Sequence, residues 1–121
     1  QRGKRMSALT GLNILDFSGF FPAPFGTRIL ADMGATVLRV EAPARPDMVR
    51  VLPPFDNQGL SACHGSLNRN KGSIVIDLKT PEGVAIIKEL VKDYDIVVEQ
   101  FRPSVTFNLL CRNRIRTTGS V

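Results

Sequence analysis

The stretch from Ala23 to Glu41 constrains the fold of this chain more than any other, because it reads as a loop, a helix and a strand in direct succession. A short apolar run from Leu12 to Phe17 precedes it and ends at Ser18-Gly19. Strand, loop, helix and strand in this order form the βαβ unit of α/β proteins. Folds of this class bind ligands at the carboxyl ends of their strands, so we expect a ligand site beside the loop after Phe17.

Local signals set the bounds of this first unit. Pro24 suits the first turn of a helix because it needs no N–H partner there, and Gly34 is a typical residue to end one. The spacing of four apolar residues predicts a single apolar face of the helix: Phe25, Ile29, Leu30 and Met33. The strand that follows, from Thr36 to Glu41, is apolar apart from its charged members Arg39 and Glu41.

A second βα unit follows a long connector. Prolines and glycines recur from Ala42 to Gly72, which makes regular structure improbable across most of that segment, and a loop of such length is usually functional or wraps a neighbour. The run from Ser73 to Leu78 suits a buried strand, and Thr80 and Pro81 then suit the N-cap and first turn of a helix. The expected core stripe of that helix and the fourth strand comprise Val84, Ile87, Leu90, Val91 and the run Ile96 to Val98.

The formal charge of +5 does not indicate a nucleic-acid partner, because much of it lies near the two ends of the chain. The residues concerned are Arg2, Lys4, Arg5, Arg112, Arg114 and Arg116. Once these are set aside, the remaining basic residues no longer outnumber the 11 acidic ones. A nucleic-acid binder concentrates its positive charge on the folded body, so we expect no nucleic-acid partner.

The two cysteines, Cys63 and Cys111, form no disulfide framework and no paired-thiol metal motif, which favours a reduced, cytoplasmic protein without a metal site. Cys63-His64 could be a nucleophile and its base, but adjacent residues on an extended chain point in opposite directions and no carboxylate is at hand to orient them. We therefore expect an ordinary loop thiol and imidazole. Residues 1–8 read as a leader, and the first five lack the apolar run of a signal peptide or membrane span.

Several motifs occur in a particular order along the body of the chain. They are Asp16-Phe17, Pro22-Ala23-Pro24-Phe25, Leu30-Ala31-Asp32 before Gly34-Ala35, Val40-Glu41, Leu67-Asn68-Arg69-Asn70-Lys71, Thr80-Pro81-Glu82-Gly83 and Gln100-Phe101-Arg102-Pro103. In this order they resemble the N-terminal part of the class III CoA-transferases, the family of formyl-CoA transferase, carnitine-CoA transferase and α-methylacyl-CoA racemase. The resemblance covers residues 9–103, which we expect to be one α/β part, and it leaves 104–121 as a divergent tail of no assigned role.

The resemblance implies a Rossmann-like α/β fold with a mostly parallel sheet, as the N-terminal part of a larger, interlocked homodimer. It also implies acyl-CoA and a carboxylic acid as substrates. Transferases of this family use an aspartate that forms a mixed anhydride and then an aspartyl-CoA thioester. Racemases of the family instead use a His and an Asp to move the proton next to the thioester. No aspartate of this chain aligns with these groups, so no catalytic residue is predicted.

By position, the resemblance places CoA beside the ends of all four predicted strands. The residues are Phe21 and Pro22 after the first strand, Ala42 after the second, Ile76, Asp77, Leu78 and Lys79 around the end of the third, and Gln100, Phe101 and Arg102 after the fourth. Lys79 offers a cation for a phosphate, Phe101 a face for adenine or pantetheine, and Gln100 both a donor and an acceptor. Ala42 stands where family members often carry an arginine, for which Arg45 or Arg39 could compensate.

The first loop has a physical rationale of its own. Free backbone N–H groups at the start of the helix at Phe25 would suit a phosphate, a thioester oxygen or a carboxylate. Phe20, Phe21, Pro22 and Phe25 would add an apolar wall for a pantetheine arm or an acyl chain. A dinucleotide site, with Glu41 on the ribose, ranks lower because the Gly-x-Gly-x-x-Gly loop is missing.

Three hypotheses therefore remain open. The first is the CoA-binding part of a CoA-transferase, and the second is the same part of an α-methylacyl-CoA racemase. The third is a non-catalytic α/β module that works only by assembly with a partner chain.

Overall fold

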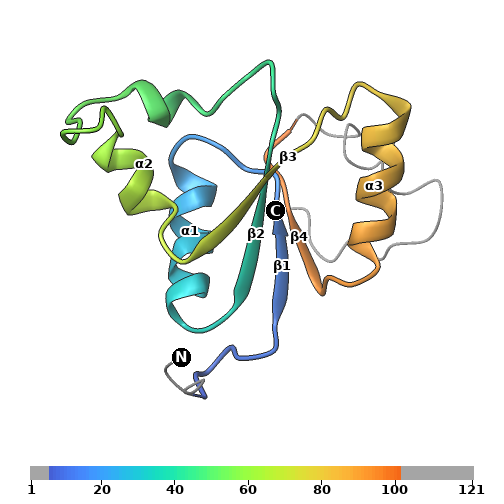
Figure 1. Cartoon of the computed structure of the whole chain (residues 1–121). Helices are drawn as coiled ribbons and strands as arrows, with labels where there is room; N and C mark the ends of the chain where they lie inside the picture. The colour runs from blue at the N-terminus through green and yellow to red at the C-terminus, as the bar shows by residue number, and fades with distance from the viewer. Residues whose placement is uncertain (1–5, 102–121) are drawn as a thin grey trace.

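Four parallel strands form the single sheet of this protein, whose computed structural model describes residues 6–101. They are β1 (Asn13–Asp16), β2 (Thr36–Glu41), β3 (Lys71–Val75) and β4 (Ile96–Val98), in the spatial order β3-β2-β1-β4. Helices α1 (Pro22–Asp32) and α2 (Ala62–Leu67) lie on one face and α3 (Pro81–Val91) on the other, as Figure 1 shows. The predicted α/β class with a mostly parallel sheet is confirmed.

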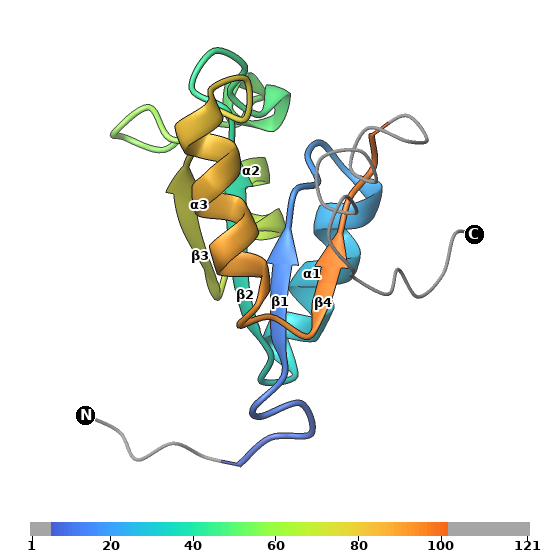
Figure 2. The same ribbon diagram turned by 90° about the vertical axis from the view of Figure 1, so that its right-hand side faces the viewer.

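Helix α3 covers one face of the sheet (Figure 2). The side chains on this face are apolar along its length. Side chains of a strand alternate between the two faces, so Leu15 and Val40 point to this side together with Phe17 just after β1. They pack against Ile87 and Val91 of α3. This cluster is the main hydrophobic core of the described residues.

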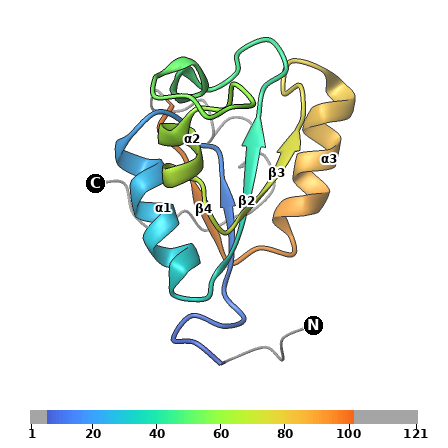
Figure 3. The same ribbon diagram turned by 60° about the vertical axis from the view of Figure 1, so that its left-hand side comes forward.

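Helices α1 and α2 cover the opposite face (Figure 3). The side chains on this face change from apolar to charged along the strands. At its amino end Ile14 and Val37 pack against Ala31 of α1. Two residues further along the same strands stand Asp16 and Arg39, which are paired in register and fully or nearly buried. The carboxyl end of this face is therefore built from charged side chains.

Helix α1 confirms the predicted first unit but packs on a different side of the helix. Its buried residues are Pro24, Thr27 and Ala31. The predicted apolar stripe is largely exposed, by 48% at Phe25, 41% at Ile29 and 43% at Met33. The small side chains let α1 approach the sheet closely, and the large ones project away from it.

The second unit begins earlier than predicted. Strand β3 starts at Lys71 and ends at Val75. It stands last in the strand order and is therefore an edge strand, and its Val75 side chain is exposed rather than buried as predicted. Helix α3 agrees with its prediction: the Thr80 side chain accepts a hydrogen bond from the N–H of Gly83 (3.1 Å), and Ile87 and Val91 are buried.

The connector from Ala42 to Gly72 contains more regular structure than predicted. It holds the 3₁₀ helix η1 (Met48–Val51) and helix α2, which begins at the N-cap Ser61. Cys63 and His64 therefore lie on a helix and not on an extended loop, and this expectation was wrong. No helix within residues 6–101 is long and apolar enough to cross a membrane.

Candidate functional site

All described strand pairs are parallel, so the carboxyl ends of the four strands lie at the same end of the sheet. We call this end the carboxyl edge, as distinct from the edge strand β3. The segments that the sequence marked for CoA follow these ends: Phe21-Pro22, Ala42, Ile76 to Lys79, and Gln100-Phe101. Gln100 Nε2 donates to the Gly19 carbonyl oxygen (2.6 Å), so the segments after β1 and β4 touch. The segment after β3 lies at the opposite end of this edge, and Arg102 lies outside the described residues.

The loop between β1 and α1 presents aromatic side chains at this edge. The Phe20 and Phe21 rings stack edge to face with 4.7 Å between their centroids, and both are exposed, as is Phe25. Phe20 adopts a left-handed conformation with a φ of 67°, which is uncommon for a bulky residue. The expected apolar wall is thus present as exposed surface.

The expected row of free N–H groups at the start of α1 is wrong. The helix begins at Pro22, so two of its first three residues, Pro22 and Pro24, carry no N–H. Phe25 donates its N–H to the Phe21 carbonyl oxygen (3.0 Å). At most the N–H groups of Phe21 and Ala23 are left for a ligand in this turn, which makes the helix start a poor anion site.

The segment after β3 divides into buried and exposed parts. The side chains of Ile76 and Leu78 pack in the core against α3, so only their backbone could meet a ligand. Asp77 accepts a hydrogen bond from the Lys79 N–H (2.9 Å) and thereby shapes the turn into α3. Lys79 itself is exposed, as is Ala42 at the end of β2.

A buried ionic cluster below this edge was missed by the sequence analysis. We define it as Asp16, Arg39, Glu41, Asp47, Arg50, His64 and Lys71. The side chains of Asp16, Lys71, Asp47 and Arg39 are exposed by only 0%, 1%, 2% and 3%. One signal could have revealed it: Arg39 and Glu41 alternate on an otherwise apolar strand, which places both on one face.

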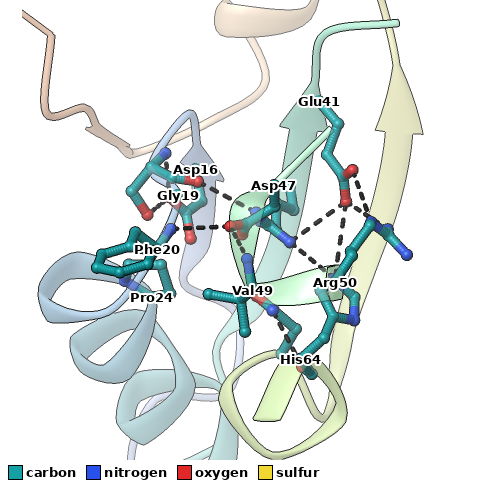
Figure 4. A network of polar contacts seen from close by, with 12 residues as sticks. Asp16, Gly19, Phe20, Pro24, Glu41, Asp47, Val49, Arg50 and His64 are labelled. Atoms are coloured by element: carbon teal, nitrogen blue, oxygen red, sulfur yellow. Dashed lines mark hydrogen bonds and ion pairs between the residues drawn. The ribbon is translucent and has the colours of Figure 1, made fainter. Parts of the chain in front are cut away.

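Arg39 contacts three other members of the cluster, Glu41, Asp47 and His64, which are labelled in Figure 4. It donates to Glu41 Oε1 (3.2 Å), to an oxygen of Asp47 and to the Ser18 carbonyl oxygen (3.5 Å). Its Nη1 also lies 3.2 Å from His64 Nε2, which acts as the acceptor because a guanidinium only donates. Arg39 is therefore a structural partner of carboxylates, which leaves Arg45 as the residue that could compensate for Ala42.

Asp16 anchors the other end of the cluster. It accepts hydrogen bonds from the Ser18 N–H (2.8 Å) and the Thr27 hydroxyl (2.7 Å), and its Oδ2 lies 3.5 Å from Lys71 Nζ. Lys71 Nζ also donates to the Pro24 carbonyl oxygen (3.0 Å), which joins the edge strand β3 to α1. Burial lowers the pKa of Lys71, while the charge of Asp16 opposes this shift.

Glu41 and His64 have coupled environments. Burial raises the pKa of Glu41, but hydrogen bonds from Arg50 (2.6 and 3.1 Å) and the charge of Arg39 outweigh it and lower the pKa overall. Burial, Arg50 and Arg39 together lower the pKa of His64. The imidazole is therefore neutral near pH 7, and three carboxylates are matched by three cations. Within residues 6–101 no group of three or more His, Cys, Asp or Glu side chains is arranged to hold a metal ion.

Comparisons with known proteins point to one family. The family model described as CoA-transferase family III matches residues 9–114. Succinate–glutarate CoA-transferase of Agrobacterium fabrum is 41% identical over 104 residues, which are 81% of this chain and 26% of that protein. Human alpha-methylacyl-CoA racemase is 38% identical over 99 residues, which are 81% of this chain and 22% of that protein.

Solved structures agree with the sequence comparisons. A CAIB/BAIF family protein from Brucella suis superimposes with a TM-score of 0.78 at 30% identity, over 87% of this chain and 29% of that one. A hypothetical protein from Mycobacterium tuberculosis gives a TM-score of 0.76 at 32% identity, over 88% and 29%. The chain thus spans about a quarter of the length of the curated relatives it matches.

Proposed function

Because this chain belongs to CoA-transferase family III, we propose that it supplies the N-terminal, CoA-binding part of an enzyme that moves CoA from an acyl-CoA to a carboxylic acid. The observation that carries the proposal is the single edge at which all four strands end. Exposed aromatic side chains and an exposed lysine follow these strand ends, and CoA needs both kinds of partner. Ligands of open α/β sheets bind at such an edge.

The proposed site has an apolar part and a cationic part. Phe20, Phe21 and Phe25 supply apolar surface for the pantetheine arm and the acyl group. Lys79 supplies a cation for a phosphate, and exposed Arg45 compensates for Ala42 at the position where an arginine is frequent. Phe101 stacks on adenine or pantetheine, while Gln100 holds the Gly19 loop and contributes less to the ligand than the sequence suggested.

We further propose that the nucleophilic aspartate lies outside this sequence. Asp16 is buried with three polar partners, and Asp77 holds the turn before α3. Asp32 is held by Arg69 (2.7 and 3.2 Å) and by Asn70 (2.8 Å). All three are engaged in holding the fold. We therefore place the catalytic groups in a longer protein, which we propose to be a cytoplasmic homodimer.

A racemase remains the alternative activity, because the human racemase is nearly as similar to this chain as the transferases are. The same strand ends would bind the acyl-CoA in either enzyme. The two activities differ only in groups that we place outside this sequence. A non-catalytic assembly module is the third candidate, and the exposed apolar face of α1 favours it.

The proposed CoA site is tested by calorimetry with CoA and acetyl-CoA. A phosphate contact and an aromatic stack are worth about 1–3 kcal/mol each, so we expect Lys79→Ala with Phe101→Ala to weaken binding about thirtyfold or more. The matched control is Lys92→Ala with Phe55→Ala, since both residues are exposed and neither belongs to the segments proposed to bind CoA.

Two outcomes would overturn this proposal. One is the absence of binding at millimolar ligand from a chain that circular dichroism shows to be folded. The other is binding that both double variants weaken equally.

A further inference from the structure

Asp47 connects the loop after β1 to the buried ionic cluster. Its Oδ1 accepts hydrogen bonds from the backbone N–H groups of Phe20 (3.1 Å) and Val49 (3.0 Å). Its Oδ2 accepts one from Arg39. Figure 4 shows this carboxylate between the Gly19-Phe20 backbone and the end of β2. A side chain from the long connector thus holds a loop 27 residues earlier in the chain.

The Phe20 backbone needs a partner of this kind. A bulky residue with a φ of 67° is strained and persists only where its surroundings fix it. Three contacts fix the loop: Asp47 on the Phe20 N–H, Gln100 on the Gly19 carbonyl, and Arg39 on the Ser18 carbonyl. Of these three contacts, only the one from Asp47 is made to Phe20 itself, and it is a charge-assisted hydrogen bond from the Phe20 N–H to the carboxylate.

Asp47 is in turn held in place by the cluster. Arg39 binds its second oxygen, and Glu41 and His64 bind the other terminal nitrogen of Arg39. Because Arg39 and Asp47 are almost fully buried, neither group can turn away without losing its partner. Arg39 of β2 and His64 of α2 therefore determine the position of the Asp47 carboxylate. Through its bond to the Phe20 N–H, this carboxylate then fixes the loop after β1.

We propose that Asp47 is a positioning residue of the CoA site, which holds the loop after β1 so that Phe20 and Phe21 face the acyl-CoA. The choice of acyl-CoA rests on the proposed function, whereas the contact with the loop does not. Asp47 does not contact the acyl-CoA itself. It influences the site through its hydrogen bond to the Phe20 backbone. The long connector, which contains Asp47, thus serves to hold the loop after β1.

Amide hydrogen exchange in the ligand-free chain tests the loop contact directly. We expect Asp47→Ala to raise the exchange rate of the Phe20 amide at least tenfold more than those of the Ile14 and Leu15 amides of β1, which report the stability of the whole fold. Asp56→Ala is the matched control, because Asp56 lies in the same connector and also accepts from two backbone N–H groups, those of Gln58 and Leu60 (both 2.8 Å). Unchanged exchange at Phe20 in folded Asp47→Ala would overturn the inference.

A second variant covers the case in which Asp47→Ala does not fold. Asp47→Asn keeps an amide oxygen for Phe20 and loses the charge toward Arg39, so a smaller rise in the Phe20 exchange rate is expected. Exchange at Phe20 that equals that of the original protein would again contradict the positioning role.

Calorimetry with CoA separates this inference from the proposed function. We expect Asp47→Ala to weaken CoA binding about tenfold or more, and Asp56→Ala to bind as the original chain does. Failure of the original chain to bind CoA would overturn the proposed function, while the exchange experiment still decides whether Asp47 holds the loop. Equal affinity of the original chain and Asp47→Ala, despite faster exchange at Phe20, would overturn the positioning of the site alone.

Discussion

At the scale of single residues, Arg39 shows how a charge can be buried in a small α/β unit. Its guanidinium contacts Glu41, Asp47, His64 and a backbone carbonyl, so most of its donors are satisfied. Removal of one partner from such a group leaves an uncompensated buried charge and costs about 3–5 kcal/mol. The cluster therefore makes the carboxyl end of the sheet rigid, but it also makes that end sensitive to protonation.

We expect acid to destabilise the protein below about pH 6.5 through His64. Burial, Arg50 and Arg39 lower the pKa of His64 below its ordinary value of 6.5, so the unfolded chain binds the proton more readily. The stability that His64 contributes is complete above pH 6.5 and is lost as the pH falls through its lowered pKa. Glu41, whose pKa is also lowered, adds a further loss below its ordinary value of 4.5. Urea unfolding at pH 7.5, 6.0 and 5.0 measures this loss.

The control for this pH effect is His64→Gln, because the chain has a single histidine. The variant should lose the decline in unfolding free energy between pH 6.5 and 5 and keep the decline caused by carboxylates at lower pH. An equal decline in both proteins would show that His64 does not report on the cluster.

At the scale of elements, α3 illustrates what the sequence could predict and α1 what it could not. The bounds of α3 follow from local signals, since Thr80 caps it, Pro81 opens it, and Ile87 and Val91 fall on its buried side. The apolar stripe of α1 was equally clear, but the side that meets the sheet is set by the sizes of Pro24, Thr27 and Ala31. The spacing of apolar residues predicts that a helix has an apolar face, but it does not predict whether that face packs against the sheet.

Replacement of glycine by alanine should change the unfolding free energy in opposite directions in these two helices. A Cβ at Gly26 of α1 would meet no atom within 4 Å, so Gly26→Ala should raise the unfolding free energy by about 0.5–1 kcal/mol. A Cβ at Gly83 of α3 would lie 1.9 Å from the Asp77 carbonyl oxygen, so Gly83→Ala should lower it by about 1–3 kcal/mol. Urea unfolding of both variants measures the difference, and effects of the same sign would contradict the packing described for α3.

At the scale of the whole molecule, the convergence of strand ends was predictable and the cluster beneath it was not. Parallel strands end at one edge in any fold of this class, so it was predictable that the segments after β1, β2, β3 and β4 lie along one edge, whereas their assignment to CoA came from the family resemblance. The ionic cluster joins residues from β1, β2, the connector and β3. The positions of Arg39 and Glu41 in β2 indicate a charged face of that strand, but the partners of these two residues depend on which strands are neighbours, and no local pattern contains that information.

The exposed face of α1 predicts association with a second copy of the chain. Phe25, Ile29 and Met33 project from α1 at successive turns, and large apolar surfaces of this kind mark interfaces. We expect sedimentation velocity to show association that increases with concentration and that Ile29→Glu abolishes. Ile86→Glu, at a somewhat more exposed position on α3, is the control and should not change the association. Equal effects of the two changes would remove α1 as the interface.

The central claim is that the carboxyl edge of this sheet binds CoA, and a CoA titration of the ¹⁵N-labelled chain tests it most directly. The account predicts amide shifts at Gly19, Phe21, Ala42, Lys79 and Phe101, with little change on the outer face of α3. Shifts centred on Ala85 and Glu89, with these strand-end amides unmoved at saturation, would contradict it.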